Sequence, residues 1–246
     1  MYRQNLDSWW RLLPPFLIAG VPLVLILKEP DLGTALLIVP AAGMMLLVSG
    51  ASARRLAIVA AAGVALAPVA YFFLLQDYQV KRVRAFVTQG AHSGDQKIGE
   101  AYQLIQSKIA VGSGGAAGKG WCRGSQNMLN FTPFRHTDFI FAVVGEEWGF
   151  LGASAAMALY LLIFALSLSI AARTREPFGR LLVVGLVSVL SAQVCINVGM
   201  TLGLLPVTGL TLPFVSYGGS SMVTSFAALG LIANVGSRRV PWVCGS

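Results

Sequence analysis

Long apolar stretches follow one another along this chain and limit the folds that it can adopt. They cover residues 12–28, 33–50, 55–75, 139–171, 179–200 and 219–236. About 20 apolar residues cross the ~30 Å hydrocarbon layer of a bilayer, and helices are the natural crossing element because lipid offers backbone polar groups no partner. Charged residues make up only 11% of the chain, against about 25% in soluble domains. We therefore predict an all-α, polytopic membrane protein with six transmembrane helices.

The net charge of +8 does not require nucleic acid as a partner, because most of the basic residues lie in loops beside the predicted membrane helices. With six spans both termini lie on one side of the membrane, and positive charge concentrates on the cytoplasmic side. The arginines near the predicted helix ends on the side of the termini are Arg3, Arg11, Arg54, Arg55, Arg173, Arg175, Arg180, Arg238 and Arg239. We predict cytoplasmic termini, a single transmembrane domain over residues 1–246, and one long extracytoplasmic loop over residues 76–138 within it.

Cysteine usage and the N-terminal stretch add two exclusions. Cys122, Cys195 and Cys244 are single and far apart, a spacing that indicates neither a disulfide framework nor a zinc site. The first apolar stretch contains Pro14 and Pro15 and continues into KEPDLG without a small-residue cleavage site. We therefore expect no cleavable signal at the start.

The long loop has a pattern of its own. Within residues 99–115, apolar residues recur at helical spacing and polar residues take the other side, which predicts a short amphipathic helix at the membrane surface. The following GSGGAAGKG, residues 112–120, matches neither a Walker loop nor a dinucleotide fingerprint. Two interpretations remain: the glycines shape the loop, or their N–H groups and Lys119 bind an anion.

Acidic residues lie inside the fourth apolar stretch. Glu146 and Glu147 belong to GEEWG, residues 145–149, and an ionised side chain at the bilayer centre costs about 2.5 to 3.5 kcal/mol on insertion scales. We expect the two glutamates to face protein, a wet cavity or the interface, either in buried structural pairing or in a functional site. Gly145 and Gly149 form a small-xxx-small pair that allows close approach of a neighbouring helix.

A polar cluster precedes the same stretch. Arg135, His136 and Asp138 stand in RHTD, directly before the apolar run. A lone Asp at this place is typical of a helix start, where it complements the helix dipole, whereas its basic neighbours favour a site at the depth of the lipid headgroups. Chemistry there on a lipid-linked sugar with a pyrophosphate leaving group needs no general acid. One carboxylate serves as general base for the incoming hydroxyl, and cations stabilise the developing phosphate charge.

These roles can be assigned to residues. Asp138 fits the general base, and His136 is a candidate to orient or relay, although the outer loop also offers it ordinary hydrogen bonds. Arg135, Lys119, Arg123 or a bound divalent cation, Mg²⁺ or Mn²⁺, fits the stabilising charge. The ligands of such a cation are not assigned.

Two further stretches lie on the outer side. KEPDLG, residues 28–33, places Asp31 between the first two predicted helices, with Pro30 in the turn. GLLPVTGLTLPFVSYGGSS, residues 203–221, holds too many prolines and glycines for one straight helix. Irregular backbone at membrane depth is tolerated where it is buried in protein or lines a cavity. This segment is therefore either a cavity wall or an ordinary outer loop before the last helix.

Four long motifs, in this order and spacing, resemble the SEDS family of cell-wall glycosyltransferases, and its RodA branch in particular. They are KEPDLGTALL, AYQLIQSKIAVGSGGAAGKGW, RHTDFIFAVVGEEWG and GLLPVTGLTLPFVSYGGSS, and the resemblance extends from about residue 10 to residue 237. It implies a bacterial inner-membrane enzyme that polymerises lipid II into glycan strands, with a class B penicillin-binding protein as transpeptidase partner. It also implies a catalytic role for Asp138 and a further functional role for Asp31.

The chain departs from the family pattern in two places. Members resemble ten-helix proteins, and this chain supplies the last six helices without the PSExxK-like motif, whose Glu and Lys contribute to the same central cavity. We therefore expect a fragment, a split gene or a truncated gene model. Phe134 stands where RodA-like sequences commonly have Glu before RHTD.

The sequence thus predicts a peptidoglycan glycosyltransferase of cell elongation and cell-shape maintenance. Asp138 takes the proton from the acceptor GlcNAc 4-hydroxyl as that oxygen attacks C1 of the donor MurNAc, and inversion gives a β-1,4 linkage. A lipid II transporter and a non-catalytic scaffold for a transpeptidase are the competing hypotheses. The expected substrate-binding residues are Asp31, Lys119, Arg123, Gln126, Arg135, His136 and Glu147.

Overall fold

A computed structural model describes residues 9–29, 31–73, 77–87, 100–124 and 136–238. All regular structure in these ranges is helical, which confirms the all-α prediction. The helices are α1 (Trp9–Lys28), α2 (Leu32–Val48), α3 (Ala53–Phe73), α4 (Asp77–Val87), α5 (Glu100–Ser113), α7 (Ile140–Arg173), α8 (Pro177–Thr201) and α9 (Gly219–Ser237).

The predicted helices are present, and one further helix was not predicted. The six long apolar stretches correspond to α1, α2, α3, α7, α8 and α9, and the amphipathic segment at 99–115 corresponds to α5. Helix α4 lies in the part of the 76–138 loop for which the sequence predicts no helix, and its sequence, DYQVKRVRAFV, is short and polar. Its Val80, Val83 and Phe86 nevertheless recur every three residues, a spacing that places them on one helical face.

Among the described helices, α1, α7, α8 and α9 are long and apolar enough to cross a membrane, and α2 is a shorter apolar helix of 17 residues. At 34 residues, α7 would be about 50 Å long if it were straight. It is interrupted at Gly149, whose backbone (φ 65°, ψ −162°) is not helical. The break divides α7 into a short part before Gly149 and a long apolar part after it.

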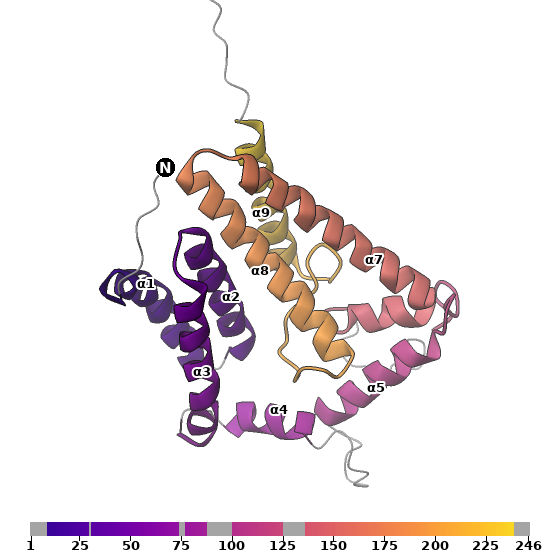
Figure 1. The fold of residues 1–246 in the computed structure, drawn as a ribbon. Helices are drawn as coiled ribbons and strands as arrows, with labels where there is room; N and C mark the ends of the chain where they lie inside the picture. The colour runs from indigo at the N-terminus through magenta and orange to yellow at the C-terminus, as the bar shows by residue number, and fades with distance from the viewer. Residues whose placement is uncertain (1–8, 30, 74–76, 88–99, 125–135, 239–246) are drawn as a thin grey trace, which may run out of the picture.

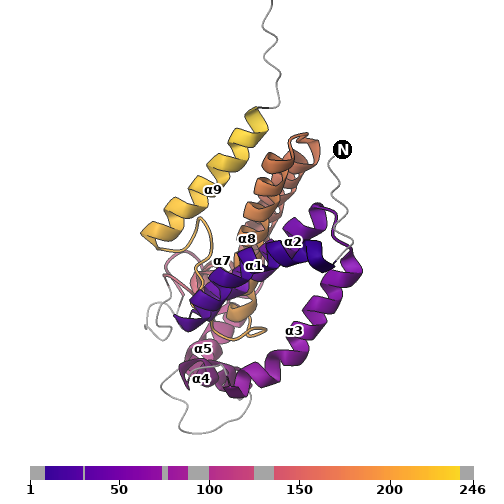
Figure 2. The ribbon, with the colours of Figure 1, turned by 90° about the vertical axis from the view of Figure 1, so that its left-hand side faces the viewer.

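Helix α8 is the centre of the packing. Figure 1 shows α7 and α8 side by side along most of their length, joined by a tight turn, with α9 behind them. Buried residues from α7, α8 and α9 make one apolar cluster: Ala171, Val183, Val184, Val187 and Ile232. On its other side α8 approaches α2 closely, because a Cβ on Gly185 would lie 2.9 Å from Sδ of Met45. Figure 2 shows α9 on one side of this layer and α3 on the other.

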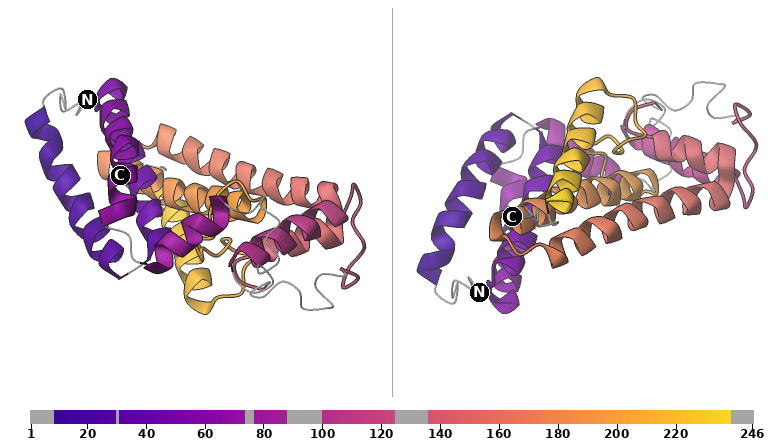
Figure 3. Two further views of the ribbon diagram at one scale, coloured as in Figure 1. Left: turned by 90° about the horizontal axis from the view of Figure 1, so that it is seen from below. Right: turned by 90° about the horizontal axis from the view of Figure 1, so that it is seen from above.

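The two ends of the helix bundle differ in character. At one end the α7–α8 turn lies beside the end of α9, since a Cβ on Gly179 would lie 3.2 Å from Cγ1 of Val235. At the other end α4 and α5 lie across the bundle (Figures 1 and 3). A second apolar cluster there joins α5 to the start of α7 and to the segment after α8: Leu104, Ala110, Phe139, Ala142 and Val207.

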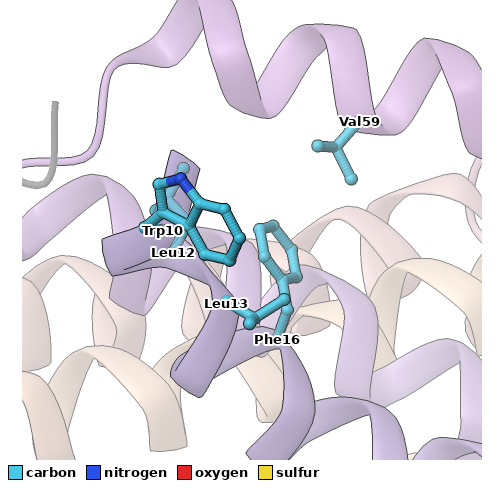
Figure 4. A pocket seen from close by; sticks show the side chains of 5 residues that line it. All are labelled: Trp10, Leu12, Leu13, Phe16 and Val59. Atoms are coloured by element: carbon cyan, nitrogen blue, oxygen red, sulfur yellow. The ribbon is translucent and has the colours of Figure 1, made fainter. Parts of the chain in front are cut away.

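A surface groove between α1 and α3 has a volume of about 360 Å³. Trp10, Leu12, Leu13, Phe16 and Val59 line it (Figure 4), and all five side chains are apolar. Such a lining suits hydrocarbon and offers no group for acid–base chemistry. The polar residues singled out from the sequence lie elsewhere.

Candidate active site

Asp138 lies just outside the start of α7. The N-cap of this helix is Phe139, which is fully buried and makes no side-chain capping bond. Asp138 therefore does not cap the helix, and its carboxyl instead bonds to Thr137. Asp138 thus stands directly before the helix start without capping it, and its interpretation as an acid that complements the helix dipole stays a prediction.

The backbone of Asp138 is fixed by α8 and by residues 202–218, which we call the return segment. Nδ2 of Asn197, in α8, donates to the carbonyl of Asp138 at 2.9 Å and to the carbonyl of Leu210 at 2.6 Å. The side chain of Asn197 has no exposure to solvent. One buried amide thus joins α8, the start of α7 and the return segment.

The two residues before Asp138 are also bonded to the return segment. Oγ of Ser216 donates to the carbonyl of Thr137 at 2.6 Å and accepts from the backbone N–H of Leu212 at 2.7 Å. The backbone N–H of Tyr217 donates to the carbonyl of His136 at 2.8 Å. Ser216 is buried, so these bonds lie in the interior and not in a mobile surface loop. The return segment packs against residues 136–138, and its interpretation as a cavity wall stays a prediction.

The carboxyl of Asp138 faces a cation that the sequence did not identify. A Cβ built on Gly209 would lie 3.9 Å from Oδ2 of Asp138 and 3.9 Å from Nη1 of Arg82, which comes from α4. Burial raises the pKa of Asp138 above its ordinary value of 3.8, while the hydrogen bond with Thr137 and the positive charge of Arg82 act in the opposite direction. Gly209 itself is exposed, which leaves this polar pair accessible from outside.

Asp31 caps α2 next to the same turn. Its Oδ1 accepts from the backbone N–H of Thr34 at 3.0 Å and its Oδ2 accepts from the Thr34 hydroxyl at 2.6 Å, the geometry of a helix N-cap. Two residues on, Gly33 packs so tightly that a Cβ there would lie 2.8 Å from the carbonyl oxygen of Thr208. Asp31 and Asp138 are therefore both placed around residues 208–210 of the return segment.

The glycine segment, residues 112–120, pairs its backbone with the break in α7. The N–H groups of Lys119 and Gly120 donate to the carbonyls of Glu146 and Glu147, at 3.0 and 2.9 Å. Beyond the break, the N–H groups of Phe150 and Leu151 donate to the carbonyls of Gly115 and Ala116, at 2.9 and 3.0 Å. The break frees helical backbone groups, and the glycine segment satisfies them.

Glycine is required for this close approach. A Cβ on Gly114 would lie 1.9 Å from the carbonyl oxygen of Gly145, and one on Gly118 would lie 2.2 Å from that of Glu147. A Cβ added to Gly145 would likewise lie 3.2 Å from Cγ2 of Val111 in α5. The prediction that the GEEWG glycines allow a close neighbour is confirmed, and the contacts support the loop-shaping interpretation of the glycine segment.

Lys119 and Glu146 form an ion pair beneath this contact. Nζ of Lys119 lies 2.7 Å from Oε1 of Glu146; the lysine side chain is 28% exposed and the glutamate side chain is fully buried. Glu146 thus has the buried structural pairing that was one of its two interpretations. The structure gives Lys119 a protein partner, and its contact with substrate stays a prediction.

For the remaining predicted site residues the structure gives exposure and backbone bonds, or no description. His136 and Arg123 are exposed, and Glu147 is half-buried at the α7 break. The backbone N–H of Arg123 donates to the carbonyl of Gly120 at 3.1 Å, so Arg123 continues the glycine segment. Gln126 and Arg135 lie outside the described residues, as does Phe134.

Two residues of the site were missed from the sequence. Arg82 stood in a segment interpreted as loop, and Asn197 stood unremarked within an apolar stretch. The available signal for Asn197 was its chemistry, since a polar residue inside a membrane helix usually faces the bundle interior and marks function. Arg82 offered only the overlooked helical spacing of α4.

The described residues contain no group of three or more His, Cys, Asp or Glu able to hold a metal ion. Mg²⁺ prefers octahedral oxygen coordination and is often held by one or two carboxylates together with substrate phosphates. Asp138 alone does not make a dedicated site of that kind.

The sequence matches the family model described as Cell cycle protein, FtsW/RodA/SpoVE, over residues 2–240. It is 42% identical over 219 residues to the peptidoglycan glycosyltransferase MrdB of Escherichia coli K12, covering 89% of this chain and 58% of that protein. It is 37% identical over 227 residues to the probable peptidoglycan glycosyltransferase FtsW of Geobacter sulfurreducens, covering 92% of this chain and 59% of the relative. The chain thus spans a little over half the length of these relatives.

Solved structures agree with the sequence matches. One is described as structural coordination of polymerization and crosslinking by a peptidoglycan synthase complex; it superimposes with a TM-score of 0.79 at 32% identity and covers 97% of this chain and 65% of that one. Another is the rod shape determining protein RodA of Thermus thermophilus, with a TM-score of 0.63, 29% identity and coverage of 97% and 60%.

Proposed function

Because this chain belongs to the FtsW/RodA/SpoVE family, we propose that it provides the catalytic helices of a membrane glycosyltransferase that polymerises lipid II into peptidoglycan strands, in cell elongation. The observation that carries the proposal is that Asp138 and Arg82 both lie near the exposed Gly209, with the charge of Arg82 acting on the Asp138 carboxyl. A carboxylate and a guanidinium at one accessible place supply the base and the positive charge that this reaction requires.

Asp138 acts as the general base. Its carboxylate takes the proton from the 4-hydroxyl of the acceptor GlcNAc while that oxygen forms a bond to C1 of the donor MurNAc. The bond between C1 and the pyrophosphate oxygen breaks, and undecaprenyl pyrophosphate leaves with the bonding electrons. A base with a raised pKa binds the transferred proton more strongly than an exposed aspartate would, and burial raises the pKa of Asp138 in this direction.

Arg82 is assigned to the leaving group. Guanidinium groups bind phosphate oxygens in bidentate geometry, and Nη1 of Arg82 in α4 reaches the turn at Gly209, as Oδ2 of Asp138 does. Asp31, Lys119, Arg123, Gln126, Arg135, His136 and Glu147 are proposed to contact the remaining parts of the two lipid II molecules. A divalent cation, Mg²⁺ or Mn²⁺, carried by the pyrophosphate is a further source of positive charge, and its requirement is tested by chelation with EDTA.

The distribution of arginines between the two ends of the helix bundle bears on how the chain is oriented in the membrane. The α2–α3 turn with Arg54 and Arg55, the α7–α8 turn with Arg173 and Arg175, and the end of α9 lie at one end of the bundle. Concentrated positive charge favours that end as cytoplasmic in the bacterial inner membrane, which puts the Asp138 site outside. A structural neighbour is described as a synthase complex of polymerization and crosslinking, and on this ground we propose a class B penicillin-binding protein as partner.

The test uses the 246-residue chain in lipid vesicles that contain labelled lipid II. Glycan polymer on a gel, sensitive to a muramidase, supports the glycosyltransferase. Movement of labelled lipid II between leaflets without polymer would support a transporter instead. Neither polymer nor movement, together with stimulation of a class B penicillin-binding protein added to the vesicles, would support a scaffold.

A further inference from the structure

We infer that Asn197 is a positioning residue of the glycosyltransferase, fixing the backbone of Asp138 against the return segment so that the carboxyl stays near Gly209, the residue that Arg82 also approaches. This inference rests on the proposed function and deepens it, because it assigns a role in catalysis to a neutral residue near the C-terminal end of α8. Asn197 does not touch the reacting atoms in this assignment.

The geometry singles out Asn197 on α8. Its one amide nitrogen bonds two carbonyls, those of Asp138 and Leu210, that belong to segments far apart in sequence. Leu210 directly follows Gly209, the residue at which Asp138 and Arg82 meet. Because Asn197 is fully buried, water cannot replace these bonds, and their loss would leave two buried carbonyls without a donor.

The bonds act on position and not on charge. Arg82 of α4 is the charged group that faces Asp138, whereas α8 presents the neutral Asn197 and the return segment presents the backbone at Gly209. His136 precedes Asp138 in the chain and is exposed. Loss of the Asn197 amide therefore leaves the neighbouring charges in place. It releases the start of α7 toward water, so desolvation weakens and the pKa of Asp138 falls.

Gln193 provides a matched control one turn earlier on the same helix. Its Nε2 donates to the carbonyl of Thr211 at 2.9 Å, so it also anchors the return segment to α8. No bond of Gln193 reaches Asp138 among those that the structure describes. Asn197→Leu and Gln193→Leu each remove one amide and one anchorage, and only the first removes the tie to Asp138.

Both variants are measured in vesicles for polymerisation kinetics as a function of pH. Misplacement of a reacting group by about 1 Å can cost ~100-fold in rate, and we expect kcat of Asn197→Leu to fall by about 10- to 100-fold with KM nearly unchanged. In Asn197→Leu the acidic limb of the pH–rate profile shifts to lower pH, while in Gln193→Leu this limb stays where it is in the parent. A second readout is independent of activity: carbodiimide labelling of Asp138, quantified by peptide mass spectrometry across pH, becomes faster in Asn197→Leu and its midpoint moves to lower pH.

The outcomes separate the inference from the proposed function. If the parent makes no polymer, the proposed function fails while the labelling profiles still decide the role of Asn197. Identical Asp138 labelling profiles in parent, Asn197→Leu and Gln193→Leu would overturn the inference. If Asn197→Leu loses its cooperative thermal transition, Asn197→Ala takes its place, because it removes the amide donor and adds neither charge nor bulk; the same direction of change is expected.

Discussion

The guanidinium of Arg82 and the carboxyl of Asp138 both lie near Gly209, where a Cβ would be 3.9 Å from an atom of each. The two residues come from α4 and from the start of α7, and the return segment after α8 brings them together. This meeting of three segments is the structural basis of the proposed reaction. It also makes the roles of individual residues separable by experiment.

The pH dependence of polymerisation tests Asp138 as the base. A general base must be ionised, so the rate falls as pH falls through its pKa. Burial raises the pKa of Asp138 above 3.8, and we expect the acidic limb of kcat/KM to have its midpoint above that value. The measurement is the initial rate of polymer formation over a pH series. A limb at or below the ordinary value for aspartate would contradict the assigned environment.

Replacement of Arg82 separates charge from position. The positive charge of Arg82 lowers the pKa of Asp138, so Arg82→Gln raises that pKa and moves the acidic limb to higher pH. Loss of leaving-group stabilisation lowers kcat by about 100-fold, the scale found when one transition-state donor is removed. Arg84→Gln is the control, because Arg84 is exposed on the same helix. Equal effects of the two substitutions would remove Arg82 from the mechanism.

The glycine segment is predicted to tolerate alanine at one position and not at another. The Cβ of Gly114→Ala would overlap the carbonyl oxygen of Gly145, at 1.9 Å, whereas a Cβ on Gly112 meets nothing within 4 Å. Overpacking of this kind destabilises by about 1 to 3 kcal/mol or more. We expect a lower thermal midpoint in detergent for Gly114→Ala and an unchanged one for Gly112→Ala. A parental midpoint for Gly114→Ala would mean that the backbone contact with α7 is absent.

The Lys119–Glu146 pair is predicted to behave as a buried ion pair. Removing one partner leaves an uncompensated buried charge, which costs on the order of 3 to 5 kcal/mol, whereas replacing both by apolar residues is often neutral. Lys119→Met should therefore lower the thermal midpoint more than the double variant Lys119→Met/Glu146→Leu. The comparison uses the same detergent and pH. A double variant less stable than Lys119→Met would show that the pair is not the main interaction of Glu146.

Local patterns in the sequence were sufficient to predict the long helices and part of the site. Apolar stretches specify membrane helices because each one satisfies its own backbone, and α5 followed from its amphipathic spacing. Asp138 and Asp31 stood out as acids at helix boundaries. The polar, short α4 gave no comparable signal, so its helix and Arg82 were missed.

Contacts between distant segments were not predictable from the sequence. The pairing of Lys119 with Glu146 and the two bonds of Asn197 depend on how α5, α7 and α8 pack. The glycine segment shows the same limit: its composition indicated close backbone approach, but the structure was needed to identify the break in α7 as its partner.

The most direct test of the proposed function is the rate of muramidase-sensitive glycan formation from labelled lipid II by the 246-residue chain and by Asp138→Asn. The amide keeps the size of the carboxyl and cannot accept the proton as a base. We predict polymer from the parent and a loss of at least about 100-fold in the variant, the lower end of the effect of general-base catalysis. Equal polymer formation by the two proteins would contradict the assignment of Asp138 as the catalytic base.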